Sequence, residues 1–295
     1  MTRMTRRVRR RSEQVYLARY RQLRITLPIN CMKNRYKLTV IILLCMVIGS
    51  CKKVIDLNLK NADPQLVIEG NITDESKPQF VSITKSVAID NSNNFPAVTG
   101  ALVNLIDQSG TFYRLTERTP GNYYSSILLG KHKQQYTLQV QYNTKTYTAV
   151  STMPDKVSID SVALSLQYFG QQVTKTIIVF YQDPLAETNQ YYFVLTINGV
   201  QVKQVFAKND YLNNGRAVQQ LLYEDDIKLK SGDQVHIEMQ CIDPIIYNYW
   251  YTLSLQQTND FSSTTPSNPV TNFNDKSVLG YFSAHTTDYK DIIIP

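Results

Sequence analysis

The stretch QYTLQVQY at Gln135–Tyr142 decides the fold class, because apolar and polar residues alternate along its whole length. Tyr136, Leu138, Val140 and Tyr142 share one face of an extended chain, and glutamine and threonine occupy the other. Successive side chains of a β-strand point to opposite faces, and an antiparallel strand with one solvated face shows this alternation. We therefore expect this stretch to be a half-buried antiparallel strand.

Similar segments surround it and define a first domain. LVIEG (66–70), FVSITK (80–85) and ALVNLID (101–107) are short, rich in β-branched residues and bounded by turn residues. About seven such strands fit between residues 66 and 151, and this spacing is typical of a sandwich. We predict an all-β protein whose first domain is a small β-sandwich over residues 65–153.

A second set of strands follows the proline-bearing linker Thr152–Asp160. Asn198-Gly199 supplies two residues that tolerate positive φ, which predicts a type I′ hairpin turn. The stretch GDQVHIEMQCID alternates again, with four apolar residues on one face and His236 on the other. We predict a second β-sandwich-like domain over residues 154–295, packed against the first.

One segment of the second domain has helical periodicity. Asp243 can cap a helix, and Pro244 suits the first helical position. Apolar residues then recur at i, i+3, i+4 and i+7, which is the spacing of one helix face. These residues are Ile246, Tyr249, Trp250 and Leu253. We predict one helix near residues 244–258.

The stretch VIILLCMVIGSCKK (40–53) indicates where the protein is located. Its apolar run, Leu38–Ile48, has eleven residues. A bilayer core needs about 20 residues, so the run suits a signal peptide rather than a membrane span. Three basic residues within 33–37 precede it, and Ile48, Gly49, Ser50 and Cys51 at its end resemble a bacterial lipobox. We expect acyl chains such as palmitate on Cys51, because two or more chains anchor a protein stably.

The residues upstream, 1–31, hold nine arginines and one acidic residue. A nucleic-acid-binding arm and a twin-arginine export signal are alternatives, but we favour translation from Met32 and interpret 1–31 as a misannotated extension. The signal peptide is then 32–50 and a tether spans 51–64.

The basic character of the chain comes from its first fifty residues. The whole chain has 31 basic and 24 acidic residues, and residues 1–50 contain twelve of the basic residues and one of the acidic residues. The remaining chain therefore has 19 basic and 23 acidic residues, which is a net charge of −4. A mildly acidic mature chain gives no reason to expect a nucleic-acid partner.

The cysteines give little chemistry to the mature chain. Of Cys31, Cys45, Cys51 and Cys241, only the last remains a free thiol after cleavage and acylation. We therefore expect no intrachain disulfide and no cysteine-based zinc site. Cys241 lies on the apolar face of its predicted strand, where we expect a small buried hydrophobe rather than a nucleophile.

Motifs of common enzymes are missing from the sequence. It contains no G-x-S-x-G, H-E-x-x-H, P-loop or G-x-G-x-x-G. His132, His236 and His285 have no glutamate or histidine at ligand spacing, so we expect structural or solvated roles for all three. We predict a protein that is not an enzyme and has no metal or cofactor.

Two clusters leave alternatives open. Glu224, Asp225 and Asp226, followed by Asp233, could bind calcium, which takes six to eight oxygen ligands. Their spacing matches no calcium loop, so we favour a solvated strand end. YNYWY (247–251) could form an aromatic platform for sugars. Its helical spacing favours core positions for the second tyrosine and the tryptophan, with one of the outer tyrosines nearer the surface.

A short motif at residues 160–162, DSV, concerns modification. It resembles the acceptor for O-glycosylation in Bacteroidetes-type envelopes, which would place a glycan on Ser161. Three residues match by chance often, and an intact mass without a hexose-sized excess would contradict this hypothesis.

Longer stretches resemble one known family. LVIEGNITDE, VTGALVNLIDQSGTFYRL and YTLQVQYNTKTYTAVSTMP, and then GDQVHIEMQCIDPIIYNYWYTLSLQQ and NPVTNFNDKSVLGYFSAH, are similar to Bacteroidetes envelope lipoproteins grouped as domain-of-unknown-function family 4249. The family tends to have a glycine-rich turn before its last strand, where this chain has one glycine in Lys276–Gly280. The resemblance implies a two-part lipoprotein whose first half is similar to transthyretin-like and carboxypeptidase-regulatory-like sandwiches. It also implies genes beside TonB-dependent transporters, and it supplies no catalytic residues.

We therefore expect a lipid-anchored, non-enzymatic protein of the outer membrane that serves as an accessory or binding component of a TonB-dependent uptake system. Either membrane leaflet fits the residues that follow Cys51. The alternative is a structural or adhesive module that holds partner proteins through exposed sheet edges. A third alternative is a hydrolase that uses the Glu224–Asp226 cluster and loses metal-dependent turnover in Asp225→Ala.

Overall fold

The computed structural model describes residues 63–87, 94–170, 172–223, 227–257 and 268–295. The predicted upstream segment, the signal peptide and all but the last two residues of the tether lie outside these ranges. The first strands are β1 (Leu66–Thr73), β2 (Lys77–Lys85), β3 (Leu102–Asp107), β4 (Phe112–Thr119), β5 (Asn122–Leu128), β6 (Gln135–Tyr142) and β7 (Lys145–Thr152).

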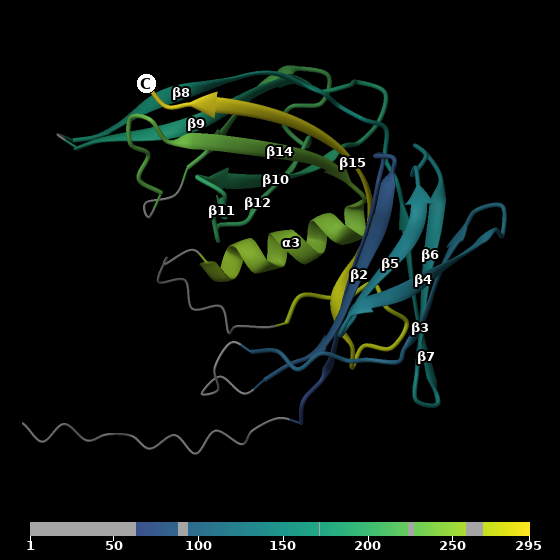
Figure 1. Cartoon of the computed structure of the whole chain (residues 1–295). Coiled ribbons are helices and arrows are strands. Elements are labelled where there is room, and N and C mark those ends of the chain that lie inside the picture. The colour runs from purple at the N-terminus through teal and green to yellow at the C-terminus, as the bar shows by residue number, and fades with distance from the viewer. Residues whose placement is uncertain (1–62, 88–93, 171, 224–226, 258–267) are drawn as a thin grey trace, which may run out of the picture. The chain divides into compact units, whose positions relative to one another are not determined.

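The second part of the chain adds eight strands and a helix (Figure 1). These are β8 (Ile159–Phe169), β9 (Gln172–Gln182), β10 (Gln190–Ile197), β11 (Val200–Gln201), β12 (Phe206–Asn209), β13 (Ala217–Leu222), β14 (Gln234–Ile242), α3 (Pro244–Gln257) and β15 (Leu279–Ile293). Over the described residues, the predicted all-β class with one helix is confirmed.

The alternating segments form strands as predicted. In β6, Tyr136, Leu138 and Val140 are buried, while Thr137 and Gln139 lie on the outer face. β14 buries its four apolar residues in the same way, from Val235 to Cys241. The two-residue turn after β10 has Asn198 at φ 50° and Gly199 at φ 80°, as a type I′ turn requires.

Most of the described strands belong to one continuous sheet, and β15 makes it continuous. The sheet has twelve strands in the order β11-β10-β14-β15-β1-β2-β5-β4-β3-β6-β7, with β12 also pairing with β10. Residues Leu279–His285 of β15 pair in parallel with β1, and Thr286–Ile293 pair antiparallel with β14. The last strand therefore joins the strands of the first half to those of the second.

Among the described residues, two large hydrophobic cores lie along this sheet, and a smaller cluster around Ile246 lies under α3. In the first half the sheet curls back on itself, because Leu138 of β6 packs against Gly70 of β1: a Cβ on that glycine would lie 2.9 Å from Leu138 Cδ2. The enclosed side chains form the first core. In the second half, a three-stranded sheet of order β13-β9-β8 covers β10 and β14 and encloses the second core.

A linear boundary at residues 153 and 154 does not separate these cores. Phe273, Val278, Phe282 and Ala284 lie far past that boundary, yet all four belong to the first core. The segment Asn61–Pro295 packs as one compact unit. The two halves thus share β15 rather than meeting only at a linker.

The helix begins as the sequence predicts. Asp243 Oδ1 accepts hydrogen bonds from the backbone N–H groups of Ile245 and Ile246, both at 3.0 Å. Its Oδ2 accepts the hydroxyl of Ser151 at 2.5 Å and the backbone N–H of Thr152 at 3.2 Å. One buried carboxylate therefore both caps α3 and holds it against β7.

The point where β15 changes partner contains a buried histidine. His285 lies inside β15, with Nδ1 3.0 Å from Ser283 Oγ and only 2% of its surface exposed. Burial lowers the pKa of His285 from 6.5 to about 4, with Asp74 opposing and Lys77 reinforcing the shift. The imidazole is therefore neutral in the folded protein near pH 7.

We expect mild acid to destabilise the fold through His285. In the unfolded chain the imidazole takes up a proton below pH 6.5, whereas in the folded chain it does so only near pH 4. The unfolded state thus binds more protons in this window, so the free energy of unfolding should fall by about 2 kcal/mol between pH 7 and pH 5. Urea unfolding at both pH values measures the change. The control variant His236→Gln changes an exposed histidine and should show the same drop in unfolding free energy between pH 7 and pH 5. A ring-proton resonance of His285 that titrates near pH 6.5 in the folded protein would contradict the prediction.

Candidate functional site

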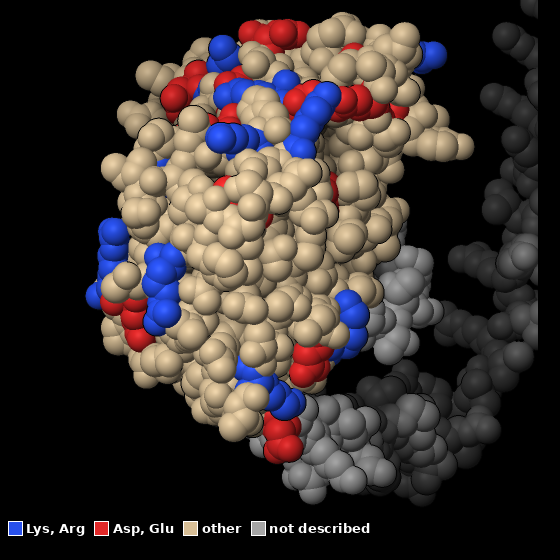
Figure 2. Space-filling model, turned by 90° about the vertical axis from the view of Figure 1, so that its right-hand side faces the viewer, with Lys and Arg blue, Asp and Glu red and all other residues tan. Residues whose placement is uncertain are grey.

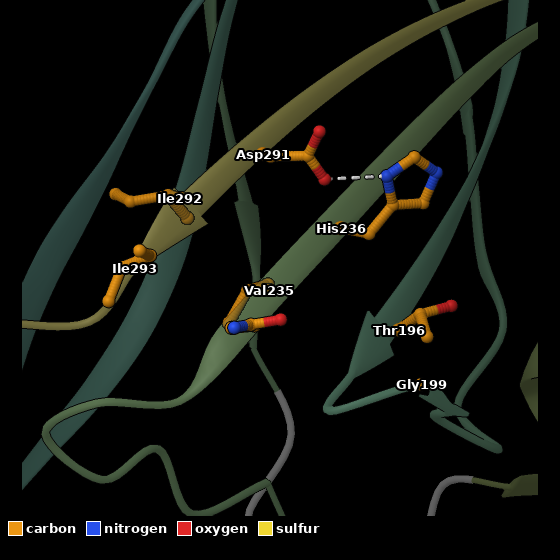
Figure 3. A pocket seen from close by; sticks show the side chains of 8 residues that line it. Thr196, Gly199, Val235, His236, Asp291, Ile292 and Ile293 are labelled. Carbon is orange, nitrogen blue, oxygen red and sulfur yellow. Dashed lines mark hydrogen bonds and ion pairs between the residues drawn. The ribbon is translucent and has the colours of Figure 1, made fainter.

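A hollow of about 640 Å³ opens at one end of the large sheet, where β10, β14 and β15 lie side by side (Figure 3). It is lined by Thr196, Gly199, Gln234, Val235, His236, Asp291, Ile292 and Ile293. Three elements meet here because β15 pairs with β14 along its second half and β14 pairs with β10. The wall therefore combines a polar row on one face with apolar side chains near the strand ends.

The polar row is set by strand register. Asp291 and Thr196 are the direct partners of His236 on the two neighbouring strands. His236 Nδ1 lies 2.7 Å from Asp291 Oδ1, and its ring stacks on Tyr289 with centroids 5.4 Å apart. Both members of the pair are solvent-accessible, with side chains 43% and 80% exposed. Sequence reasoning missed this pair because its members are 55 residues apart.

This arrangement favours hydrogen bonding over covalent chemistry. A histidine oriented by a carboxylate can carry a proton, but nucleophilic catalysis also needs a partnered nucleophile. Thr196 supplies the one hydroxyl among the residues that line the hollow, and no hydrogen bond joins that hydroxyl to His236, which pairs with Asp291 instead. Among the described residues, no group of three or more histidine, cysteine or acidic side chains is placed to hold a metal ion. The lining is mainly apolar, with the His236–Asp291 pair as its polar part, and we interpret the hollow as a binding surface.

A second surface feature, which we name the loop patch, consists of Leu185, Tyr211 and Leu212. These side chains are 76%, 85% and 75% exposed, and they lie on the β9–β10 loop and the β12–β13 loop. The two loops touch, because a Cβ added at Gly215 would lie 2.8 Å from Leu185 Cδ1. Large apolar side chains this exposed are a sign of an interaction site when they occur together.

Two buried aspartates hold these loops in place. Asp183 accepts the hydroxyl of Tyr191 at 2.5 Å and the backbone N–H of Gly215 at 3.0 Å. Asp210 accepts the backbone N–H of Asn189 at 2.7 Å. Burial and the neighbouring carboxylate raise the pKa of Tyr191, so its hydroxyl stays protonated and continues to donate to Asp183. The loop patch is thus displayed on a fixed backbone.

The predicted aromatic segment divides as its periodicity indicates. Trp250 stacks on Tyr192 of β10 with centroids 4.4 Å apart, and Tyr249 is half-buried beside it. Tyr247 is also half-buried and stacks on the exposed Tyr251, with ring centroids 5.5 Å apart. α3 thus packs its central aromatics and Tyr247 against the body of the protein, and Tyr251 is the exposed tyrosine of the segment.

Other predicted residues have structural surroundings. Cys241 is buried, and burial raises the pKa of its thiol to about 11, so it does not act as a nucleophile at neutral pH. His132 lies at 3.5 Å from Asp74 and 3.9 Å from Asp155. Asp233 closes a turn by accepting the backbone N–H of Lys230 at 2.7 Å.

Three predicted sites remain predictions. Cys51 with its lipobox and the Glu224–Asp226 cluster lie outside the described residues. Ser161 is exposed on β8 beside a β-bulge, so its hydroxyl is accessible to a modifying enzyme. None of the helices in the described part of the chain is both long and apolar enough to cross a membrane.

Comparison with known proteins gives one family match. The model of a family described as domain of unknown function DUF4249 matches residues 52–291. None of the curated proteins matches this chain. Among solved structures, a DUF4785 family protein from Legionella pneumophila is 13% identical with a TM-score of 0.25. The similarity covers 60% of this chain and 52% of that one, so this chain spans about half of its length.

Proposed function

This chain belongs to the DUF4249 family, and on that basis we propose that it is a lipid-anchored, non-enzymatic protein of the outer membrane that binds a partner protein as an accessory of a TonB-dependent uptake system. The observation that carries the binding role is the loop patch. Three large apolar side chains on loops held by Asp183 and Asp210 form a preorganised contact surface. Preorganised loops lose little conformational entropy when a partner binds.

The lipid anchor is supported by the leader sequence. A basic segment, an apolar run, two small residues and Cys51 follow in the order of a lipoprotein signal. Acyl chains contribute about 0.8 kcal/mol for each buried methylene group, so two or more chains hold a protein on a membrane. The tether after Cys51 would connect this anchor to the body of the protein.

We predict that Cys51→Ala releases the protein from the membrane. Without an acylated cysteine, nothing in the proposed anchor holds the chain, and metabolic labelling with a palmitate analogue should fall to background. Fractionation and in-gel detection of the label measure both effects. Cys241→Ala is the matched control and should leave labelling unchanged, because Cys241 is buried. Equal labelling of the Cys51→Ala protein would refute the anchor.

Partner binding is tested by co-purification. The full chain with a C-terminal tag is expressed in a host that has TonB-dependent transporters and is isolated from detergent-solubilised outer membranes. We expect one such transporter in near-equal amount by quantitative mass spectrometry. Recovery of the protein without a transporter would contradict the accessory role.

The second candidate function is adhesion through a sheet edge. β8 has eleven residues and forms an edge of the three-stranded sheet. Leu166, Tyr168 and Val173, at the end of the β8–β9 hairpin, are 46%, 68% and 50% exposed. A long edge with exposed apolar residues can accept a strand of another protein. Binding to a matrix protein, lost when proline replaces Ser165, would favour this function over transport.

A further inference from the structure

The outer face of β3, β6 and β7 carries no charged residue in three successive rows. Register places Asn104, Gln139 and Thr148 in one row across the three strands. The rows on either side continue with Leu102, Gln141 and Thr146, and with Ile106, Thr137 and Val150. Residues between these positions, such as Leu138 and Val140, point into the first core. We name this surface the polar sheet face.

Figure 2 views the molecule from the side on which these strands lie in Figure 1. It shows a broad area of uncharged side chains, with lysine, arginine and acidic side chains gathered toward the margins. At one margin β4 adds Arg114 opposite Asn104 and Phe112 opposite Ile106. Phe112 is 66% exposed. The face thus combines an uncharged polar centre with an exposed aromatic ring at its edge.

From this arrangement we propose that the polar sheet face binds a neutral oligosaccharide. The amides of Asn104 and Gln139 and the hydroxyl of Thr148 can each donate and accept hydrogen bonds, as the hydroxyl groups of a sugar do. Adjacent strands are about 4.8 Å apart, so one sugar residue can contact side chains of two strands. An aromatic ring has a negative face that attracts the electropositive C–H groups of a sugar ring. Phe112 provides such a ring.

Charge and size argue against other occupants. A nucleic acid needs several lysine or arginine contacts to phosphate, and Arg114 is the one charged residue in these rows. Nine outward positions cover about 300 Å², given about 4.8 Å between strands and about 6.8 Å between alternate residues. A stable protein interface buries about 800 Å² on each side around an apolar centre. A neutral, narrow and hydroxyl-rich ligand fits the face better, and it leaves the loop patch free for a protein.

Calorimetric titration of the purified full chain tests the proposal. The neutral probes are cellohexaose, maltohexaose and mannohexaose, and the acidic probe is hexagalacturonate. We expect saturable binding of at least one neutral probe and no preference for the acidic one. Gln139→Ala should weaken that binding about fivefold, which equals about 1 kcal/mol. Phe112→Ala should also weaken it, because the stacking surface is removed.

Matched controls separate this site from the rest of the surface. Gln201→Ala changes an exposed glutamine on β11 and should leave affinity within about twofold. Gln139→Glu keeps the side-chain size and should also weaken binding, and thermal unfolding verifies that each variant is folded. No saturable binding of any neutral probe, or binding that Gln139→Ala and Phe112→Ala leave unchanged, would overturn the proposal. A dimer in sedimentation that Gln139→Arg dissociates would also overturn it and assign the face to a second copy.

Discussion

Gly280→Ala is expected to lower the free energy of unfolding by about 4 kcal/mol or more, which is at the extreme of single substitutions. Gly280 is the second residue of β15 in its parallel pairing with β1, lies opposite Ile68 and has φ +92°. An alanine Cβ would lie 2.1 Å from the carbonyl oxygen of Ile68. Backbone atoms cannot move aside without breaking the pairing, so the clash adds to the cost of the positive φ. Urea unfolding measures the loss.

Gly110→Ala is the matched control for this prediction. Gly110 has φ +86°, and no atom would come within 4 Å of an added Cβ. Alanine at this position should lower the free energy of unfolding only by the cost of holding an L-residue at positive φ, about 1 kcal/mol. If Gly280→Ala and Gly110→Ala lower the free energy of unfolding equally, the close packing of β15 on β1 does not contribute to stability. That result would contradict the role of β15 in joining the two halves.

Asp243→Ala is expected to destabilise the protein by about 4 kcal/mol. Loss of the helix cap costs about 1 kcal/mol. Loss of the carboxylate also leaves the buried hydroxyl of Ser151 without its acceptor, at about 1–3 kcal/mol, and removes the acceptor of the partly buried N–H of Thr152. Ser151 in turn accepts the N–H of Ala284 in β15, so the change reaches a third element. Denaturant titration followed by circular dichroism measures the loss.

Two variants calibrate this result. Asp243→Asn keeps an oxygen for the cap but presents an amide group to Thr152 N–H, so we expect an intermediate loss. Asp275→Ala removes a partly exposed turn carboxylate that accepts the N–H and hydroxyl of Ser277, and should cost about 1 kcal/mol at most. If Asp243→Ala lowers the free energy of unfolding no more than Asp275→Ala does, the hydrogen bonds of Asp243 to α3 and β7 contribute little to stability.

Local patterns predicted the elements well. Alternation identified β6 and β14, the Asn-Gly pair identified the turn after β10, and Asp243 with Pro244 marked the start of α3. These signals succeed because each depends on residues close in sequence. The division of YNYWY into packed and outer aromatics followed from the same periodicity.

Long-range pairing was beyond local patterns. Nothing near residue 285 indicates that β15 continues to Ile293 or that it pairs with β1 more than 200 residues earlier. Strand partners are chosen by packing across the whole sheet, so propensity alone does not define them. The same limit applies to the candidate sites. His236 meets Asp291, and Asp183 meets Gly215, through register and loop contacts rather than through spacing.

The most direct test of partner binding measures transporter recovery with the loop patch altered. In the co-purification described above, the double variant Leu185→Asp/Tyr211→Asp places two charges on the patch. Val200→Asp, 71% exposed on β11, is the control. Partner binding through the loop patch predicts at least a tenfold loss of transporter, about 1.4 kcal/mol, in the double variant and near-equal recovery in the control. Equal transporter recovery with both variants, or none with the unaltered chain, would contradict the account.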